Sequence, residues 1–489
     1  MLILFFGSCT GNNSGKENAE NSSLRYGLTT EPVTLDPVNP ANTADGRSIL
    51  FNVFEGLVKP SPEGKLLPAV AESFNIEQNS LVYIFTIREG VVFHNGEILK
   101  PTDVVFSLNT AIQNGFPGFG NIDRIEKSGE RDIRIHLKEA DPDFLPYLTV
   151  GIVPENNPDR EKNPIGTGPF IIESYTPQRS LVLKKNPDYW HNGLPLLDEV
   201  TLIFVSDSDA LLTGLRGGNI EGAAVTGAQL SQLSPDEFDI IPWYSNTVQL
   251  LALNNAVKPL DNPIVRKAIN YALNISGIID TAFFGKGEPS GSPLIPGLRD
   301  IYEESLRNPY PFDTEKAKTL LAEAGFADGF PLEIIVPSNY TMHVDTAQVI
   351  VNQLKDAGIN CTIKLVDWGT WFSEVYRGRI YQATIISLDA NNVSPRSFLS
   401  RYVSGDSGNF INFNSPEYNL VYKAALVEND EIKRIALYRD CQKIISDNAA
   451  SVFIQDILGF RAFSGGRFGG VANYPLYIID FAPIYKKSH

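Results

Sequence analysis

Cysteine and histidine are scarce in this chain of 489 residues. Of its three cysteines, Cys9 lies near the amino terminus, whereas Cys361 and Cys441 lie among apolar neighbours on a predicted strand and a predicted helix. Two cysteines make no disulfide framework, and we interpret both as small buried hydrophobic residues. The five histidines are scattered, no HExxH pattern occurs, and no cysteine pair has zinc spacing. The sequence therefore predicts no metal site and no cofactor.

Positive charge and long apolar runs are also in short supply. The chain has 41 lysines and arginines against 57 aspartates and glutamates, which gives a net charge of −16. Because binding to nucleic acid depends on concentrated positive charge, we expect no nucleic-acid partner. No apolar run is long enough to predict a membrane-spanning helix. The length exceeds one ordinary hydrophobic core, so we expect at least two lobes.

The familiar catalytic motifs are missing as well. There is no GxSxG, no P-loop and no GxGxxG after a predicted strand. We expect His94, beside a turn, and His136, within a strand, to be structural. The Asp141/Asp143 pair is interpreted as a solvated loop cluster. These absences favour a binding protein over an enzyme.

The stretch from residue 81 to residue 108 is the most informative one that is present. Alternating apolar residues predict a strand over residues 82–88, and Asn95-Gly96 is a strong turn signal. A helix is expected from Pro101 onward. The Thr102 hydroxyl is expected to cap this helix, and the Asp103 charge suits its positive end.

Other segments predict elements by the same rules. Residues 48–57 have the apolar spacing of a helix, and residues 242–255 have the composition of a strand that passes between lobes. A strand at 332–336, a helix at 345–357 and a strand at 361–366 predict a β-α-β unit. Such a unit places its two strands parallel.

Several short blocks of sequence occur in a characteristic order. They are FEGL at 54–57, AESF at 71–74, YIFTIREGVVFHNG at 83–96, TDVVFSL at 102–108, GTGPF at 166–170, NPDYW at 186–190, VRKA at 265–268, and DTEKAKTLL at 313–321 with AG at 324–325. Together they resemble family 5 of the bacterial extracellular solute-binding proteins, which are the receptors of peptide- and nickel-type ABC importers. One such block is weak evidence, whereas an ordered set over nearly the whole chain is specific.

The resemblance implies an α/β fold of the type II periplasmic-binding-protein kind, in which two lobes close around a central cleft. With this fold, we place a truncated lipoprotein signal at residues 1–9, a flexible tether at 10–23, the core of lobe I at 24–60 with 164–258 and 461–489, a subdomain packed on lobe I at 61–163, and lobe II at 259–460.

The resemblance also locates the expected ligand loop. In peptide-binding members, the loop after a strand such as residues 382–387 commonly has a tryptophan, then an aspartate four residues before a proline, which pairs with the amino terminus of the ligand. Here Leu388 stands in place of the tryptophan and Asn391 in place of the aspartate, counting back from Pro395. The nearest carboxylate, Asp389, lies two positions early. Two interpretations stay open: Asp389 reaches the ligand if the loop bulges, or Asp389 and the asparagines only form Asx turns.

Further groove candidates come from neighbouring segments. Trp368 ends a strand that helps to line the groove in relatives, and Tyr244 and Asn246 begin the apolar segment between the lobes. Arg396 and Arg401 could hold a ligand carboxylate in a bidentate fork. The candidate ligand-binding residues are therefore Asp389, Asn391, Asn392, Trp368, Tyr244, Asn246 and Arg396.

The first nine residues, MLILFFGSC, are apolar and end at Cys9 after two small residues, which resembles a lipobox. In such a signal the cysteine becomes the lipidated first residue of the mature protein. Residues 10–23 are nearly all small or polar, so they predict a flexible tether. We expect an extracytoplasmic protein anchored by lipid to the cell membrane, in the periplasmic space or on the outer face of the cytoplasmic membrane.

The expected function is that of the substrate-binding receptor of an ABC importer. It would capture a short peptide in the interlobe cleft, as a monomer, and deliver it to the permease subunits in the membrane. Two alternatives stay open. One is a receptor for nickel or a metal chelate, since segments 252–274 and 436–440 resemble the nickel-binding branch. The other is a cell-surface hydrolase, which would require a nucleophile or metal site that the sequence does not reveal.

Overall fold

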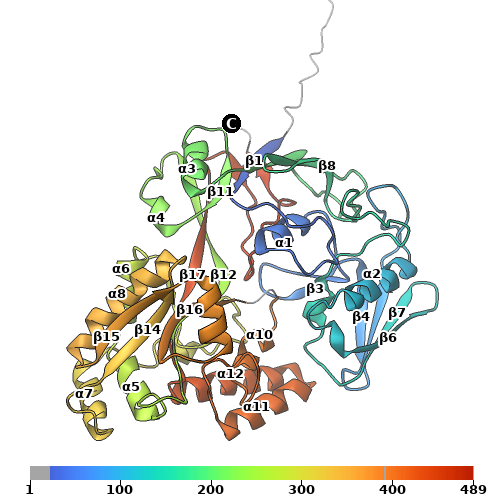
Figure 1. Ribbon diagram of the computed structural model, residues 1–489. Coiled ribbons are helices and arrows are strands. Elements are labelled where there is room, and N and C mark those ends of the chain that lie inside the picture. The colour runs from blue at the N-terminus through green and yellow to red at the C-terminus, as the bar shows by residue number, and fades with distance from the viewer. Residues whose placement is uncertain (1–21, 390–391, 488–489) are drawn as a thin grey trace, which may run out of the picture.

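The computed structural model describes residues 22–389 and 392–487. It is a mixed α/β structure in which one long sheet runs through two lobes and a smaller sheet lies at one side (Figure 1). The predicted signal, which includes Cys9, and most of the predicted tether lie outside the described residues, as does Asn391 of the predicted ligand loop. The predicted end of the tether at residue 23 is wrong, since strand β1 begins at Ser23.

The long sheet is the spine of the molecule. In spatial order its strands are β15 (Asn360–Val366), β14 (Pro331–Pro337), β16 (Ala383–Asp389), β12 (Phe238–Leu253), β17 (Ser451–Ser464), β11 (Gly222–Val225), β1 (Ser23–Leu28), β10 (Glu199–Phe204), β9 (Ser180–Lys185) and β8 (Phe170–Thr176), and β13 (Glu288–Pro289) pairs with β17. We call the half around β1 lobe I and the half around β14 lobe II. Strand β14 pairs parallel with both of its neighbours, as does β1.

Two long strands, β12 and β17, cross from one lobe to the other (Figure 1). They pair antiparallel from Phe238 opposite Ser464 to Ala252 opposite Ser451, with two shifts of register in between. We call this paired stretch of β12 and β17 the hinge. The strand predicted at residues 242–255 is confirmed, although it begins earlier, at Phe238.

The lobe II end of β12 explains its continuous apolar sequence. Successive side chains of a strand point to opposite faces. Val248 and Leu250 pack into one hydrophobic cluster, whereas Leu251 and Leu253 pack into another on the other face. All four side chains are fully buried. A strand covered on both faces has no reason to alternate apolar with polar residues.

A second sheet of four antiparallel strands forms a subdomain beside lobe I. Its spatial order is β4 (Ala71–Glu77), β5 (Val82–Ile87), β7 (Asp132–Leu137) and β6 (Ile122–Ser128). Helix α2 (Pro101–Gln113) packs on this sheet through Val104 and Leu108, which are fully buried. The predicted strand and helix of this stretch are confirmed.

The start of α2 corrects the predicted cap. The N-cap residue is Lys100, and its backbone N–H donates to the Asp103 carboxylate at 2.8 Å. The same carboxylate accepts the backbone N–H of Glu155 at 2.9 Å. The cap comes from Asp103 rather than from the Thr102 hydroxyl, and the same carboxylate also joins the helix start to Glu155.

Lobe II contains the predicted β-α-β unit. Strands β14 and β15 pair parallel, with Leu332 opposite Cys361, and α8 (Thr341–Asp356) connects them. The helix begins four residues before its predicted start at Asp345. The other helices of this region are α5 (Pro263–Tyr271), α6 (Ile275–Ala282), η3 (Glu304–Leu306), α7 (Thr314–Glu323), α9 (Trp368–Thr370), the π-helix η4 (Trp371–Arg377), α10 (Arg396–Leu399), η5 (Ser400–Tyr402), α11 (Pro416–Val427) and α12 (Glu431–Asp447).

The helix predicted at residues 48–57 is wrong in its bounds. Helix α1 covers Ala44–Leu50, and Thr43 caps it by accepting the Gly46 N–H. Beyond it, the side-chain amide of Asn52 donates to the carbonyl of Ile479 and accepts the N–H of Phe481, each at 2.8 Å. The chain leaves the helix here because the C-terminal segment supplies these tertiary hydrogen bonds.

The remaining elements are short. They are β2 (Val58–Pro60), β3 (Leu66–Pro68), η1 (Phe119–Asn121), η2 (Leu145–Thr149), α3 (Ser208–Arg216), α4 (Gly227–Leu230), β18 (Phe468–Gly469) and β19 (Tyr485–Lys486). Cys441 is fully buried in α12 and Cys361 half-buried on β15, and both are free thiols. Within residues 22–389 and 392–487, no helix has the length and apolar character needed to cross a bilayer.

Candidate functional site

A cleft of about 600 Å³ lies where lobe I, the subdomain, the hinge and lobe II meet. Its lining is mostly apolar, with a few polar groups, which is the usual composition of a ligand site. The lining residues are Pro37, Asn39, Pro40, Asn42, Ala44, Arg47, Leu50, Phe51, Phe54 and Pro60 of lobe I, Leu66, Phe116, Pro117, Gly118, Pro146, Tyr147, Thr149, Val150 and Gly151 of the subdomain side, Ser245 and Thr247 of β12, Asp389, Asn392, Val393, Ser397 and Arg401 of lobe II, and Leu476, Tyr477 and Ile478.

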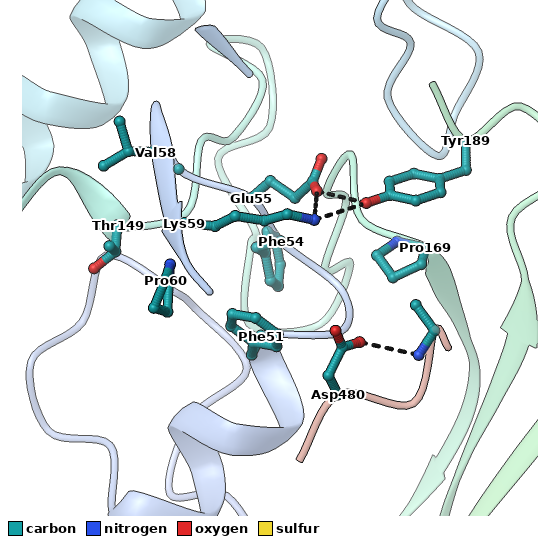
Figure 2. Close-up of a pocket in the computed structure, with 12 residues that line it drawn as sticks. Phe51, Phe54, Glu55, Val58, Lys59, Pro60, Thr149, Pro169, Tyr189 and Asp480 are labelled. Carbon is teal, nitrogen blue, oxygen red and sulfur yellow. Dashed lines mark hydrogen bonds and ion pairs between the residues drawn. The ribbon is translucent and has the colours of Figure 1, made fainter. Parts of the chain in front are cut away.

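The aromatic wall of lobe I is supported from behind by a buried polar cluster, which Figure 2 shows. The Glu55 carboxylate accepts a hydrogen bond from the Tyr189 hydroxyl at 2.7 Å and from the Lys59 ammonium at 3.4 Å. The indole N–H of Trp190 donates to its other oxygen. Because Glu55 directly follows Phe54, this cluster fixes the segment that presents Phe51 and Phe54 to the cleft.

This cluster also explains several of the sequence blocks. Glu55 belongs to the block at 54–57, and Tyr189 belongs to the block at 186–190. Between them runs the block at 166–170, where Gly168 donates its N–H to the carbonyl of Val53 at 2.9 Å. A side chain at Gly168 would come within 2.6 Å of the Val53 backbone. These blocks therefore build the joint that holds the cleft wall, and Phe54 is the residue of these three blocks that lines the cleft itself.

Two other motif residues are likewise structural. His94 is half-buried and bonds to the Gly168 carbonyl at 3.1 Å, and desolvation lowers its pKa to about 4. Arg266 donates to two backbone carbonyls just after α12 and to two just before α5, and burial lowers its pKa to about 10. The structural interpretation of His94 agrees with these contacts.

Asp389 ends β16 and is exposed to the cleft. Its backbone is paired with Thr247 of β12, and its carbonyl accepts a hydrogen bond from the Arg401 guanidinium at 3.0 Å. Asp389 and Arg401 are therefore neighbours on the lobe II wall, joined through the Asp389 backbone. Such a pair can meet an ammonium and a carboxylate of one ligand.

Asn392 lines the cleft but uses its amide oxygen for local structure. This oxygen accepts the Ser394 N–H and the Ser397 hydroxyl, each at 3.0 Å, which is an Asx-type turn. Its carbonyl accepts a hydrogen bond from the Asn246 amide at 3.2 Å. Asn246 is fully buried at a positive φ of 56° in the hinge. Asn246 thus ties the ligand loop to the hinge.

Arg47 of α1 faces Asp389 from the lobe I wall. Its guanidinium donates to the Asn42 carbonyl at 2.7 Å, and its side chain remains exposed in the cleft. The cleft walls partly desolvate the Arg47 guanidinium, which lowers its pKa, whereas the Asp389 charge opposes this shift. The sequence did not suggest Arg47, because nothing in its local pattern distinguishes it from a surface arginine.

Arg396 forms an ion pair with Asp141 of the subdomain, away from the cleft lining. Next to it, Arg434 lies 3.4 Å from the Asp143 carboxylate, and the Tyr438 hydroxyl donates to the same group. We call these five residues the clasp, because they join lobe II to the subdomain. The clasp corrects the prediction that Asp141 and Asp143 are solvated, since both are largely buried by arginines distant in sequence.

The clasp has the electrostatics of a partly desolvated charge cluster. Burial alone would lower the pKa of Arg396, but the Asp141 carboxylate raises it above its ordinary value. Burial raises the pKa of Asp143, and the Tyr438 hydrogen bond and the Arg434 charge oppose that rise. Each charge therefore depends on its partner across the interface.

Trp368 and Tyr244 are placed away from the cleft. Trp368 is 43% exposed and stacks on Trp371 with ring centroids 5.0 Å apart. Tyr244 is half-buried and donates its hydroxyl to Glu288 at 3.1 Å. Of the predicted ligand residues that the structure describes, Asp389 and Asn392 line the cleft, together with Arg401.

The cleft contains few metal ligands. Its described lining includes one carboxylate, Asp389, and neither histidine nor cysteine. Across residues 22–389 and 392–487, no group of three or more histidine, cysteine, aspartate or glutamate side chains could hold a metal ion. Oxygen and nitrogen donors sufficient for a bare transition-metal ion are therefore not assembled there.

Comparison with known proteins agrees with this geometry. The family model "Bacterial extracellular solute-binding proteins, family 5 Middle" matches residues 65–410. The di/tripeptide-binding protein 2 of Pseudomonas aeruginosa is 28% identical, and the match covers 91% of each chain.

Solved structures share the same two-lobed fold. The ABC-transporter-associated periplasmic binding protein DppA of Helicobacter pylori, in complex with the peptide STSA, has a TM-score of 0.75 and 25% identity, covering 95% of this chain and 98% of that one. The substrate-binding protein CtaP of Listeria monocytogenes has a TM-score of 0.86 at 24% identity, covering 95% and 99%. The second likeness concerns the fold alone.

Proposed function

This chain belongs to the bacterial extracellular solute-binding proteins of family 5, and from that premise we propose that it is the extracytoplasmic receptor of an ABC importer, which captures a short peptide between its lobes and delivers it to the permease. The observation that carries the proposal is the apolar cleft of about 600 Å³ between lobes joined by the hinge. The relative that is named a di/tripeptide-binding protein and the related structure with a bound peptide support the choice of cargo.

The groups around the cleft suit a peptide. Asp389 would hold the amino terminus, because a buried ammonium is costly without a carboxylate partner. Arg401, beside it, would hold a carboxylate, and the aromatic lobe I wall would cover apolar side chains. The loop residues Asn391 and Asn392 would complete this site. Lobe closure around the hinge would then exclude water from these contacts.

Other functions receive less support. Nickel as a bare ion would need more ligands than the described lining offers. Members of this family are substrate-binding receptors, and we propose no catalytic activity for this chain.

Incubation of the purified protein with a mixture of di- to pentapeptides tests the proposal. Native mass spectrometry should find peptides retained intact in a one-to-one complex. Recovery of shorter fragments would indicate a hydrolase. Retention of no peptide, with a metal chelate bound instead, would favour the nickel-type alternative.

The finer points of location and organisation are part of the same proposal. We propose that lipid on Cys9 anchors the protein to the membrane, with the segment between Cys9 and β1 as the tether, and that it acts as a monomer with the lobe boundaries given above. In cells that export the full chain, Cys9→Ser should move the protein from the membrane fraction to the soluble fraction. An unchanged distribution would contradict the anchor.

A further inference from the structure

The charged and the apolar parts of the cleft lining lie on different walls. The charged residues of the described lining are Asp389 and Arg401 on lobe II and Arg47 on lobe I. On the subdomain side the described lining residues Phe116, Pro117, Gly118, Pro146, Tyr147, Thr149, Val150 and Gly151 are all uncharged. The Thr149 hydroxyl donates to the Pro146 carbonyl at 3.1 Å, so its hydrogen is already used within the subdomain. This side of the cleft therefore offers a ligand mainly apolar surface.

Phe116 and Tyr147 are the aromatic residues of this surface, and both are half-buried. Each packs on the hydrophobic core of the subdomain. The Phe116 ring lies 5.8 Å from the Phe119 ring, and the Tyr147 ring lies 6.1 Å from the Phe144 ring, measured between centroids. The Phe116 N–H donates to the Ala111 carbonyl at 2.9 Å, and the Tyr147 N–H donates to the Phe144 carbonyl at 3.1 Å. The subdomain therefore fixes both residues while part of each remains exposed.

Gly118 brings the two aromatic segments into contact. Its φ is positive, at 84°, and a Cβ atom at this position would lie 2.2 Å from the Tyr147 ring. The ring therefore lies directly against the Gly118 backbone, which only glycine permits. Pro117 and Pro146 restrict the backbone beside the aromatic residues. We call Phe116, Pro117, Gly118, Pro146 and Tyr147 the apolar subsite. Because it is already formed, its ordering costs little when a ligand binds.

The apolar subsite disfavours a charged group. The charges that act on the Tyr147 hydroxyl are those of Arg396, Asp141 and Asp143, which belong to the clasp, where Arg396 pairs with Asp141. A ligand ammonium or carboxylate placed on the subsite would lose water without meeting an opposite charge in the described subdomain lining. An apolar side chain would instead gain free energy in proportion to the area that it removes from water.

On the basis of the peptide-receptor function proposed above, we propose that Phe116 and Tyr147 are specificity-determining residues, and that the apolar subsite binds one large apolar side chain of the cargo while Asp389 and Arg401 hold its charged ends. The two rings can pack edge to face or offset against an aromatic side chain of the ligand. The receptor then prefers short peptides with one aromatic or large aliphatic residue over peptides that contain only small residues.

Isothermal titration with a set of tripeptides tests this inference. The set consists of trialanine and of the tripeptides in which phenylalanine or lysine replaces one alanine at each of the three positions. At least one phenylalanine peptide should bind the wild type about tenfold or more tighter than trialanine, which is the gain expected from burying such a side chain. No lysine peptide should bind as tightly as this phenylalanine peptide, because the subsite offers its ammonium no partner.

Substitutions in the apolar subsite should change this preference rather than binding as a whole. Tyr147→Ala should weaken the best phenylalanine peptide about tenfold and trialanine less than about twofold, since trialanine has no large side chain to bury. Tyr147→Phe keeps the ring and should keep the preference. Phe116→Ala, from the other segment of the subsite, should also reduce it. Phe312→Ala, at an exposed aromatic residue outside the cleft lining, is the matched control and should leave all affinities unchanged.

The outcomes separate this inference from the function on which it rests. The apolar subsite is overturned if no phenylalanine peptide reaches a tenfold preference, if a lysine peptide binds equally tightly, or if Tyr147→Ala and Phe116→Ala both keep the preference. The peptide-receptor function stands in each of these cases, because the peptides still bind. If none of the tripeptides binds and the peptide mixture leaves nothing retained, both are overturned.

Discussion

Lobe II is joined to the rest of the molecule at the hinge and at the clasp, and these two contacts consist of different kinds of interaction. The hinge is a ladder of backbone hydrogen bonds between β12 and β17 that continues the long sheet across both lobes. The clasp is a set of side-chain ion pairs between the subdomain and helices α10 and α12. In Figure 1 the strands of the hinge run through the centre, whereas α10 and α12 approach the subdomain from below.

This difference indicates which of the two contacts can separate when the lobes move apart. Separation of the hinge strands would break a continuous ladder and expose buried apolar side chains, so the hinge persists through any lobe movement. Opening the clasp exchanges protein partners for water, and the charges on both sides are well solvated once apart. The hinge therefore determines how the lobes are connected, and we expect the clasp to contribute to the balance between an open and a closed form.

The largest effect is expected from breaking the clasp on one side. Arg434→Met removes the cation that faces Asp143 at 3.4 Å and leaves a buried carboxylate with reduced compensation. Because the clasp forms only when the lobes are together, the loss falls on the closed form. Peptide affinity should weaken by about 2–4 kcal/mol, as measured by calorimetry.

A double-variant cycle is the control for this prediction. Asp143→Asn alone should also weaken binding, and the pair Arg434→Met with Asp143→Asn should weaken it by less than the sum of the two. An affinity unchanged in Arg434→Met would mean that the clasp does not contribute to closure.

The contribution of the hinge to stability should depend on pH rather than on ligand binding. His343 of α8 is buried beside the hinge and accepts a hydrogen bond from Gln249 at 3.1 Å, which requires the neutral ring. Burial lowers its pKa to about 4, below its ordinary value of 6.5. The unfolded chain therefore binds more protons between these values, and stability is lost as the pH falls from about 6.5 towards 4.

The variant His343→Gln tests this contribution. The wild type should lose about 2–3 kcal/mol of unfolding free energy through this histidine between pH 7 and pH 4. His343→Gln should lose less over the same range, as measured by urea unfolding. Equal losses in both proteins would show that His343 does not carry the acid sensitivity.

The same two regions show what the sequence could predict. The strand through the hinge was predictable because its apolar run is local, and the β-α-β unit of lobe II because its turn and helix signals lie within one short segment. The clasp was not predictable. Asp141 meets a partner 255 positions away in sequence, and no local pattern at either residue identifies the other. The early end of α1 has the same cause, since Asn52 bonds to a segment more than 400 residues later.

The cleft was predictable only in part. The loop that contains Asp389 was found through the family pattern, and the structure brings Asp389 and Asn392 to the cleft. Trp368 was expected to line the cleft, but it stacks on Trp371 instead. Arg47, Phe51 and Tyr477 are brought to the cleft by the packing of segments far apart in the chain, which residue spacing does not encode.

A second hinge residue, Asp456, should make the protein less stable as the pH rises, which is the opposite of the effect of His343. Both carboxylate oxygens of Asp456 are buried and have no hydrogen-bond partner among the described residues. Burial raises its pKa well above 3.8, and the Glu288 charge adds to the rise. The folded chain binds the proton more tightly than the unfolded chain, so stability is lost as the pH rises above the ordinary value.

Asp456→Asn removes the ionisation and should therefore stabilise the protein. The gain should be about 1–2 kcal/mol at pH 8 and smaller at pH 5, as measured by urea unfolding. Peptide affinity should change little, because the hinge ladder is the same in open and closed forms. A gain that is independent of pH would mean that Asp456 does not titrate in the folded protein.

The smallest effect is expected from the neutral contact beside the clasp. The hydroxyl of Ser80 in the subdomain donates to the side chain of Asn429, just before α12. Asn429→Ala removes this hydrogen bond without leaving a charge unpaired, and a neutral hydrogen bond contributes only about 0.5–1.5 kcal/mol. Water can replace the lost acceptor at this partly exposed position, so peptide affinity should fall by about 0.5 kcal/mol. Comparison of its affinity loss with that of Arg434→Met distinguishes the contribution of the ion pairs from that of neutral contacts at the interface. Equal losses of peptide affinity in the two variants would mean that lobe closure depends on the shape complementarity of the two surfaces. A several-fold larger loss in Arg434→Met would mean that lobe closure depends on the ion pairs.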